Sequence, residues 1–239
     1  MATFVLVHGG GHGGWCYRSV AQILRGAGHE VHTPTLTGLG ERAHLLHPGV
    51  DLDTHIGDID GVLRYEDLTD VILVGHSYGG MVITGAADRA PNRVGQLVYL
   101  DAATPVNGQS LVDVAGDIMA AARLDSRVVD GVELVLHPFA EAGMFYGVTD
   151  PEVLAWMADR LTPHPWRCFE QALDLRNEAE LWALPQSHIV CSSTVPSRDP
   201  ELVAAARTAG RFFEIDTGHD LMITEPRAVA DALMQVASA

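Results

Sequence analysis

A short glycine-rich motif offers the clearest chemistry in this sequence. Residues 75–80 read Gly-His-Ser-Tyr-Gly-Gly, follow the apolar run Val71–Val74 and precede a segment with helical composition. In the G-x-S-x-G pattern a strand turns so tightly into a helix that small flanking residues are needed, and the serine hydroxyl is left exposed at the helix N-terminus. The helix dipole and free amides there favour developing negative charge. The motif predicts that Ser77 is a nucleophile, the alternative being an ordinary serine in a glycine-rich turn.

A base for this serine is expected near the C-terminus. His219 lies in Asp216–Met222, a loop between the last predicted strand and the last predicted helix. An imidazole placed there can accept the Ser77 proton and later deliver it to a leaving group. Most of the twelve histidines are expected to be solvated surface residues. His219 is singled out by its neighbourhood.

Three segments together resemble the α/β-hydrolase superfamily, and in particular its small plant-type methylesterase and hydroxynitrile-lyase branch. They are the opening Phe4–Tyr17 (Phe-Val-Leu-Val-His-Gly-Gly-Gly-His-Gly-Gly-Trp-Cys-Tyr), the turn around Ser77, and Thr217–Asp220 (Thr-Gly-His-Asp). The resemblance covers both ends of the chain, and the middle is matched only loosely. It implies an α/β-hydrolase fold and a triad in the chain order nucleophile, acid, histidine.

The acid of this triad has two candidates. In most relatives it follows the penultimate strand, but here Cys191–Arg198 contains no carboxylate. Asp199 comes late, precedes Pro200 and has the sequence of a helix N-cap. Asp101 ends an apolar strand, where a buried carboxylate is costly without a partner, and some members of the related haloalkane dehalogenases place an acid at that strand end. We favour Asp101, with Asp199 as the alternative acid and a turn or helix cap as the alternative role of Asp101.

Two backbone N–H groups are expected to form an oxyanion hole. Tyr78, the residue after the nucleophile, supplies one, and by resemblance to the methylesterases Gly10 supplies the other. His8 is expected to order the glycine loop rather than to react. The same loop also fits the dinucleotide-binding pattern G-x-G-x-x-G, but the second predicted strand ends in Thr33-Pro34 instead of the acid that a ribose requires.

The elements that must position these residues alternate between short β-branched runs and helical segments. Such alternation predicts a mainly parallel sheet of six strands with helices on both faces. The predicted strands are Thr3–His8, Glu30–Thr33, Val71–His76, Gln96–Asp101, His188–Cys191 and Arg211–Ile215. The predicted helices are Trp15–Ala27, Thr54–Tyr65, Tyr78–Ala90, Pro200–Ala209 and Glu225–Ala237.

Between Asp101 and His188 the alternation stops, and no buried strand is evident. Residues 105–185 are therefore expected to form a helical cap inserted after the strand that ends at Asp101, and residues 1–104 and 186–239 to form the hydrolase core. Helices are expected at Leu111–Leu124, Pro151–Leu161 and Trp166–Leu175. The side chains expected to line a pocket in the cap, or to form its own core, are those of Phe145, Tyr146, Trp156, Met157 and Trp166.

Composition excludes several classes of function. The 239 residues include 31 acidic and 15 basic side chains, a net charge of −16, so neither nucleic acid nor an anionic membrane surface is an expected partner. All fifteen basic residues are Arg, which removes lysine Schiff-base and P-loop chemistry. Three scattered cysteines fit a cytoplasmic protein with reduced thiols. The pairs His29/His32 and His44/His47 lack the third ligand of a zinc site, so no metal is expected.

The sequence therefore predicts a cofactor-independent serine hydrolase for an ester of a small to medium apolar or aromatic substrate. Two alternatives remain. A hydroxynitrile lyase, by resemblance, would need a lysine where this chain has Asp220. A non-hydrolytic member of the fold, either a ligand binder or a cofactor-free oxygenase, would use the same Ser/His pair differently. The oligomeric state is left open, a homodimer being one option.

Overall fold

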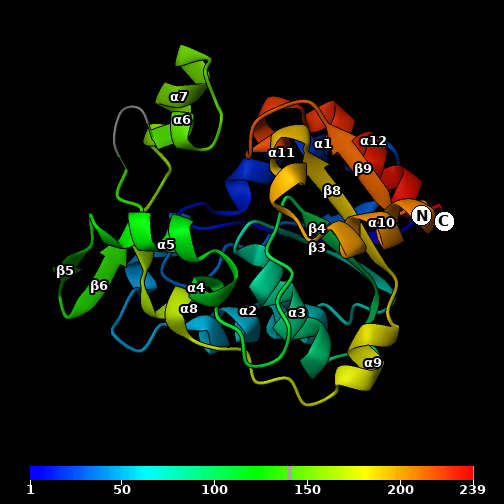
Figure 1. Cartoon of the computed structure of the whole chain (residues 1–239), viewed down its shortest axis with the longest axis horizontal. Coiled ribbons are helices and arrows are strands. Elements are labelled where there is room, and N and C mark those ends of the chain that lie inside the picture. The colour runs from blue at the N-terminus through cyan, green and yellow to red at the C-terminus, as the bar shows by residue number, and fades with distance from the viewer. Residues whose placement is uncertain (139–141, 239) are drawn as a thin grey trace.

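The computed structural model describes residues 1–138 and 142–238, and a six-stranded sheet forms its centre (Figure 1). The strand order is β2-β1-β3-β4-β8-β9, and every neighbouring pair is parallel. The strands are β1 (Thr3–Val7), β2 (Glu30–His32), β3 (Val71–His76), β4 (Val94–Leu100), β8 (Gln186–Cys191) and β9 (Phe212–Ile215). The six predicted strands are confirmed, each within about two residues at its ends.

Alternating side chains along the strands supply two separate hydrophobic cores. Phe4 and Leu6 of β1 belong to the core that α1 and α12 cover. Val5 and Val7 point to the other face and pack with α2 and α3. Because both faces are covered by helices, the strands read as continuous apolar runs.

The helices of the sheet begin and end close to the predicted positions. Those around the sheet are α1 (Arg18–Gly26), α2 (Leu52–Tyr65), α3 (Gly79–Arg89), α10 (Pro200–Thr208), α11 (Leu221–Thr224) and α12 (Pro226–Val236). The predicted helix at Trp15 is divided, because the 3₁₀ turn Gly14–Tyr17 precedes α1. A capping box between Asp51 and Thr54 fixes the start of α2 two residues before its predicted start. No helix among the described residues is long and apolar enough to cross a bilayer.

The insertion between β4 and β8 consists mostly of short helices, with a small antiparallel sheet that the sequence did not reveal. The helices are α4 (Leu111–Val114), α5 (Gly116–Arg123), α6 (Ala142–Phe145), α7 (Pro151–Ala158), α8 (Arg167–Glu170) and α9 (Glu178–Ala183). The small sheet pairs β5 (Arg127–Val129), β6 (Val132–Val135) and β7 (His164–Pro165). In Figure 1 most of the insertion lies to the left of the sheet, with α6 and α7 projecting above, whereas α9 lies at the lower right next to α3.

The insertion is anchored to the sheet by part of its apolar surface. Trp166 and Phe169 belong to the same core as α2 and α3. Tyr146 and Met157 instead form a separate small cluster, against which Trp156 packs. Four of the five expected lining residues are thus divided between the main core and a core of the cap itself, whereas Phe145 is exposed.

Candidate active site

Ser77 occupies the sharp turn between β3 and α3. Its φ of 53° lies in the left-handed region, an uncommon conformation for a residue other than glycine. Its amide donates to the Leu100 carbonyl at 3.3 Å. Because His76 pairs with Leu100 in the β3–β4 register, Ser77 and Asp101 leave neighbouring strands at the same level of the sheet.

The glycines around Ser77 are required by close backbone contacts. A Cβ on Gly75 would lie 2.5 Å from the Gly79 oxygen, and one on Gly80 would lie 2.0 Å from the Ala103 oxygen. A Cβ on Gly9, in the loop after β1, would lie 2.8 Å from the Ser77 Cβ. The turn therefore packs without space for side chains, and the glycine loop lies directly against the serine.

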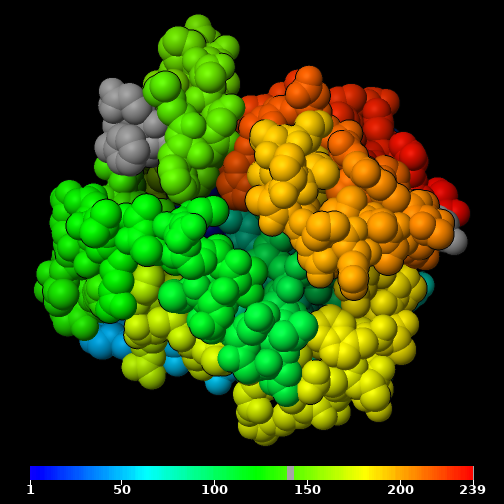
Figure 2. Space-filling model, in the orientation of Figure 1, coloured from blue at the N-terminus to red at the C-terminus, as the bar shows by residue number. Residues whose placement is uncertain are grey.

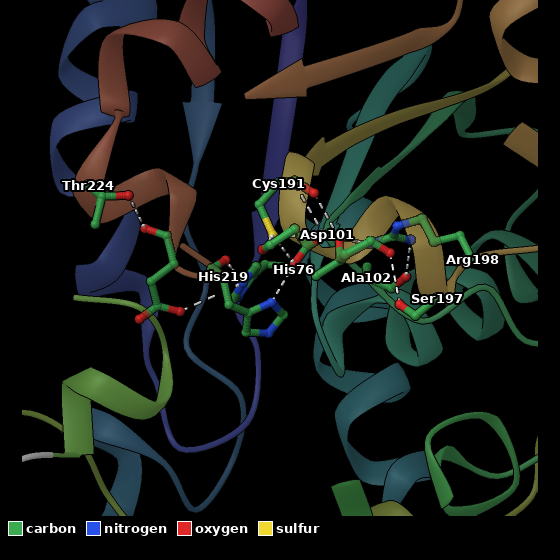
Figure 3. A network of polar contacts seen from close by, with 11 residues as sticks. His76, Asp101, Ala102, Cys191, Ser197, Arg198, His219 and Thr224 are labelled. Atoms are coloured by element: carbon green, nitrogen blue, oxygen red, sulfur yellow. Dashed lines mark hydrogen bonds and ion pairs between the residues drawn. The ribbon is translucent and has the colours of Figure 1, made fainter. Parts of the chain in front are cut away.

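The structure brings Asp101 and His219 together. The Nδ1 atom of His219 lies 2.6 Å from Oδ2 of Asp101, whose carboxylate is buried, while the His219 side chain is 29% exposed. Asp101 itself has a φ of 43°, so both Ser77 and Asp101 adopt a left-handed backbone at the ends of their strands. Figure 3 shows Asp101 between His219 and His76 on one side and Arg198 on the other.

The second oxygen of Asp101 is held by the turn that follows β8. Oδ1 accepts hydrogen bonds from Thr194 Oγ1 at 2.6 Å and from Arg198 Nη2 at 2.5 Å. Burial alone would raise the pKa of Asp101, but the contact with His219, the Thr194 hydroxyl and the Arg198 charge together hold that pKa well below its usual range. Asp101 is therefore an ionised hydrogen-bond acceptor for the imidazole.

Sequence reasoning missed Thr194 and Arg198. They lie in the Cys191–Arg198 segment, which it searched only for a carboxylate. A strand end that lacks the acid but carries a hydroxyl and a guanidinium is a usable signal, because these groups can serve an acid on the neighbouring strand.

The alternative acid, Asp199, lies elsewhere. Its side chain accepts from the amide of Glu201 at 2.8 Å and caps the N-terminus of α10. This is the capping geometry that its position before Pro200 suggests. The structure therefore places Asp101, and not Asp199, against His219.

His76 links the serine turn to the loop that carries His219. Its Nε2 donates to the His219 carbonyl at 2.9 Å, and the two ring centroids are 4.7 Å apart. Burial lowers the pKa of His76 to about 3, so its ring is neutral. In the described residues the Ser77 hydroxyl has no hydrogen bond to His219, and such a bond commonly tightens only when substrate binds.

The two predicted oxyanion donors lie beside the serine turn. In the described part of the chain, no hydrogen bond from the backbone N–H of Gly10 or of Tyr78 to another residue is present. A Cβ on Gly10 would lie 2.9 Å from Leu136 and 3.2 Å from Phe169, so these side chains of the insertion cover the glycine loop. The side chain of Tyr78 is buried, and its hydroxyl lies 2.9 Å from His55 Nδ1.

An apolar cavity of about 210 Å³ adjoins the glycine loop. Its lining residues are Ala121, Ala122, Asp125, Leu136, His137, Phe145, Tyr146 and Leu161. Leu136 and the Tyr146 hydroxyl also lie within about 4 Å of where a Cβ on Gly11 would be. Figure 2 shows a hollow in the middle of this face, between the green insertion and the gold segment that follows β8.

The expectation of mostly exposed histidines is wrong. Six of the twelve are buried, namely His8, His12, His55, His76, His164 and His188. The sequence gives no periodic signal for these positions, because several of them lie in loops and bond to backbone groups. His8, which was expected to order the glycine loop, does so through a contact of 2.8 Å from its Nδ1 to the Gly9 oxygen.

Among the described residues, one set of side chains is close enough to hold a metal ion. It consists of His55, His164 and Cys168, whose candidate ligand atoms lie within 4.8 Å of one another. However, Nδ1 of His164 accepts from the Gly11 amide at 3.2 Å, so its Nε2 carries the proton and offers no lone pair. Both ring nitrogens of His55 also have hydrogen-bond partners. The set fits a hydrogen-bonding role better than a metal site.

Known proteins resemble this chain along nearly its whole length. A family model described as "Alpha/beta hydrolase family" matches residues 4–232. The "Carbendazim hydrolyzing esterase" of Nocardioides sp. (strain SG-4G) is 40% identical over 244 residues, covering 98% of each chain. "Methylesterase 18" of Arabidopsis thaliana is 25% identical over 257 residues, covering 98% of this chain and 97% of its own.

Solved structures show the same fold. An extracellular alpha/beta-hydrolase from a Paenibacillus species, described as sharing structural and functional homology with tobacco salicylic acid binding protein 2, superposes with a TM-score of 0.80 at 24% identity over 98% of both chains. Polyneuridine aldehyde esterase superposes with a TM-score of 0.77 at 22% identity over 99% of both chains.

Proposed function

The chain belongs to the alpha/beta hydrolase family and is an esterase-type hydrolase, and from that premise we propose that it cleaves esters or related acyl compounds with Ser77 as nucleophile and without a cofactor. The observation that carries this proposal is the 2.6 Å contact between His219 Nδ1 and Asp101 Oδ2, at the edge of the sheet where Ser77 leaves β3. A carboxylate at Nδ1 fixes the tautomer in which Nε2 is free to act as a base.

The proposed reaction has two halves. The Ser77 oxygen attacks the ester carbonyl while His219 takes the hydroxyl proton, and the N–H groups of Gly10 and Tyr78 stabilise the oxyanion. The carbon–oxygen bond to the alcohol then breaks, and His219 gives the proton to the departing oxygen. Water, deprotonated by His219, next attacks the acyl-enzyme. The bond from the acyl carbon to the Ser77 oxygen breaks, His219 returns the proton to that oxygen, and the carboxylic acid leaves. Asp101 remains ionised throughout.

The proposed substrates are small to medium apolar or aromatic esters. The apolar cavity beside the glycine loop supports this choice, since its volume of about 210 Å³ is below the range of about 300–1,000 Å³ that is common for drug-sized ligands. We also propose that residues 105–185 act as a cap that provides this cavity to a core formed by residues 1–104 and 186–239. Carbendazim, from the name of the 40% identical relative, is a candidate substrate.

Hydrolysis of p-nitrophenyl acetate and butyrate, and of carbendazim, tests this proposal. Ser77→Ala is expected to lower kcat by about 10⁴-fold or more, because the covalent route is lost. Ser19→Ala, at an exposed position on α1, is the matched control and is expected to hydrolyse the same esters at the wild-type rate. Full esterase activity of folded Ser77→Ala would overturn the proposal.

A further inference from the structure

Three fully buried histidines surround the glycine loop and bond to its backbone. Nδ1 of His8 lies 2.8 Å from the Gly9 oxygen, and Nδ1 of His12 lies 2.8 Å from the Gly10 oxygen. The amide of Gly11 donates to Nδ1 of His164 at 3.2 Å. All three residues are buried, and at most 1% of the His12 side chain is exposed. The esterase reaction as described above assigns no role to His12 or His164.

These bonds fix both peptide planes that flank Gly10. The Gly9–Gly10 plane carries the Gly10 N–H, and its carbonyl is held by His8. The Gly10–Gly11 plane is held at its oxygen by His12 and at its N–H by His164. Glycine has the widest choice of backbone angles, so a loop of three glycines does not fix the direction of an N–H by itself. The histidines restrict the rotation about both backbone bonds of Gly10.

His12 differs from the other two histidines in its charge. His8 donates to Gly9 and accepts from the Leu36 amide at 3.0 Å, so its ring is neutral. The second nitrogen of His12, Nε2, lies 2.9 Å from Oδ2 of Asp220, and its first faces the Gly10 oxygen. Burial alone would raise the pKa of Asp220, but the neighbouring His12 ring lowers it, so Asp220 is an ionised acceptor. The Gly10 oxygen also accepts, so both ring nitrogens donate and His12 is an imidazolium. Burial opposes this charge, but Asp220 raises the pKa of His12 above its ordinary value.

Asp220 connects this arrangement to the catalytic histidine. It follows His219 directly in the chain, is fully buried, and its amide donates to the Tyr146 oxygen at 2.9 Å. The remaining neighbours of the His12 ring are aromatic, with Trp15 stacked at 5.3 Å and Tyr146 edge-on at 4.8 Å. The His12 ring is therefore held in one orientation. It bridges the loop that carries His219 and Asp220 and the glycine loop that carries Gly10.

We propose that the buried His12–Asp220 pair is a positioning device for the oxyanion hole. It holds the Gly10–Gly11 peptide plane and so, together with His8 on the preceding plane, limits the rotation about Gly10 that would turn its N–H away from the developing oxyanion. The pair also ties that loop to the residue after His219. This inference rests on the proposed function. It assigns Asp220 to the interior, so the carboxylate that replaces the lysine of hydroxynitrile lyases does not face the reacting atoms. His12 and Asp220 touch no substrate atom in this role.

The test compares two side chains of nearly equal shape at position 12. In an Asp220→Asn background, which avoids an unpaired buried carboxylate, His12→Asn keeps an N–H close to the place of Nδ1, whereas His12→Leu has no donor. His12→Leu is expected to lower kcat about 10- to 100-fold relative to the background with KM within about 3-fold, because the oxyanion forms only after binding. Removal of an oxyanion-hole donor lowers kcat by about 10²- to 10³-fold. The loss expected here is smaller, because Gly10 keeps its N–H. His12→Asn is expected to recover most of the lost kcat.

Affinity for a trifluoromethyl ketone supplies a readout that a merely structural role would not move. The hydrated or serine-bound ketone resembles the tetrahedral intermediate, so its inhibition constant is expected to rise in His12→Leu by the same factor as kcat falls. Rates are expressed per competent site, counted by the final extent of fluorophosphonate labelling. If His12→Leu does not fold, His12→Gln replaces it, because its longer amide reaches residue 220 rather than the Gly10 oxygen.

Equal kcat per competent site and equal ketone affinity in the Asn variant and the donor-free variant would overturn the proposal. A loss confined to KM would overturn it as well. These outcomes differ from a failure of the proposed function, in which the wild-type protein itself would not react with the fluorophosphonate or hydrolyse esters.

Discussion

Two aspartate–histidine pairs meet at consecutive residues of one loop, and their surroundings differ. His219 pairs with Asp101, and its side chain remains 29% exposed. Asp220 pairs with His12, and neither side chain is more than 1% exposed. The first carboxylate is also held by Thr194 and Arg198, whereas the described contacts of the second carboxylate involve only histidine rings.

Solvent access, rather than the aspartate–histidine pair itself, therefore separates the proposed base from a structural ion pair. A base must reach solvent or substrate in order to exchange its proton, and only His219 can do so. His12 has acceptors at both ring nitrogens, so it has no free lone pair to offer. The extra donors on Asp101 keep that carboxylate ionised beside a partly exposed partner. The following substitutions test this contrast.

Asp101→Asn should have the largest effect on the exposed pair. The amide can donate to Nδ1 of His219, which favours the tautomer with its proton on Nε2 and removes the base. We expect kcat for ester hydrolysis to fall by about 10³- to 10⁴-fold with little change in KM. A loss of less than 10-fold would place the acid elsewhere.

Arg198→Gln should lower kcat less than Asp101→Asn does, and it should change how the unfolding free energy depends on pH. Without the guanidinium, the pKa of Asp101 rises toward its unfolded value, and the carboxylate loses a donor that aligns it with His219, so kcat at pH 7 is expected to fall about 10-fold. Because the folded pKa of Asp101 is depressed, its contribution to stability is present above the unfolded pKa of about 3.9 and is lost as pH falls through the folded value. The unfolding free energy of the wild-type protein should therefore exceed that of Arg198→Gln by its largest amount at pH 7, and this difference should shrink below about pH 4. A stability difference that does not shrink below about pH 4, or an unchanged kcat at pH 7, would contradict the role of Arg198.

Thr194→Val removes one hydrogen bond and keeps the side-chain shape. A single hydrogen bond to a charged group contributes about 1.5–3 kcal/mol. Because Oδ1 of Asp101 retains Arg198, most of this loss should be compensated, and we expect kcat to fall only about 3-fold. Steady-state kinetics at pH 7 measures it. A loss as large as that of Asp101→Asn would mean that Thr194 acts on the reaction more directly.

Asp199→Ala should leave kcat unchanged and lower stability. Its carboxylate caps α10 and lies outside the active-site contacts, so the unfolding free energy should fall by about 1 kcal/mol. Urea denaturation and ester hydrolysis separate the two effects. A hundredfold loss of kcat would revive Asp199 as the acid.

The strands and the serine turn could be predicted because their signals are local. Runs such as Val71–Val74 are β-branched and uninterrupted, and the glycines around Ser77 are required by contacts within the motif. The small sheet of the insertion could not be predicted in this way. β5 is fully exposed and β7 has two residues, one of them Pro165, so neither carries an apolar pattern.

The surroundings of the site depended on long-range pairing. Asp101 and Thr194 are 93 residues apart, and His12 and Asp220 are 208 apart, so no spacing rule connects them. The chemistry of the residue types still limited the choices, because a buried strand-end carboxylate demands a partner. Sequence reasoning supplied the acid candidate, and the fold supplied the donors that hold it.

Labelling with a fluorophosphonate, followed by peptide mass spectrometry, would show whether Ser77 is the activated nucleophile. If the Asp101–His219 pair, with its partly exposed imidazole, activates Ser77, the reagent should add one phosphonyl group per chain, on Ser77. The rate of labelling should fall with Asp101→Asn but not with Asp199→Ala. Absence of labelling, or a label on another residue while ester hydrolysis continues, would contradict the account.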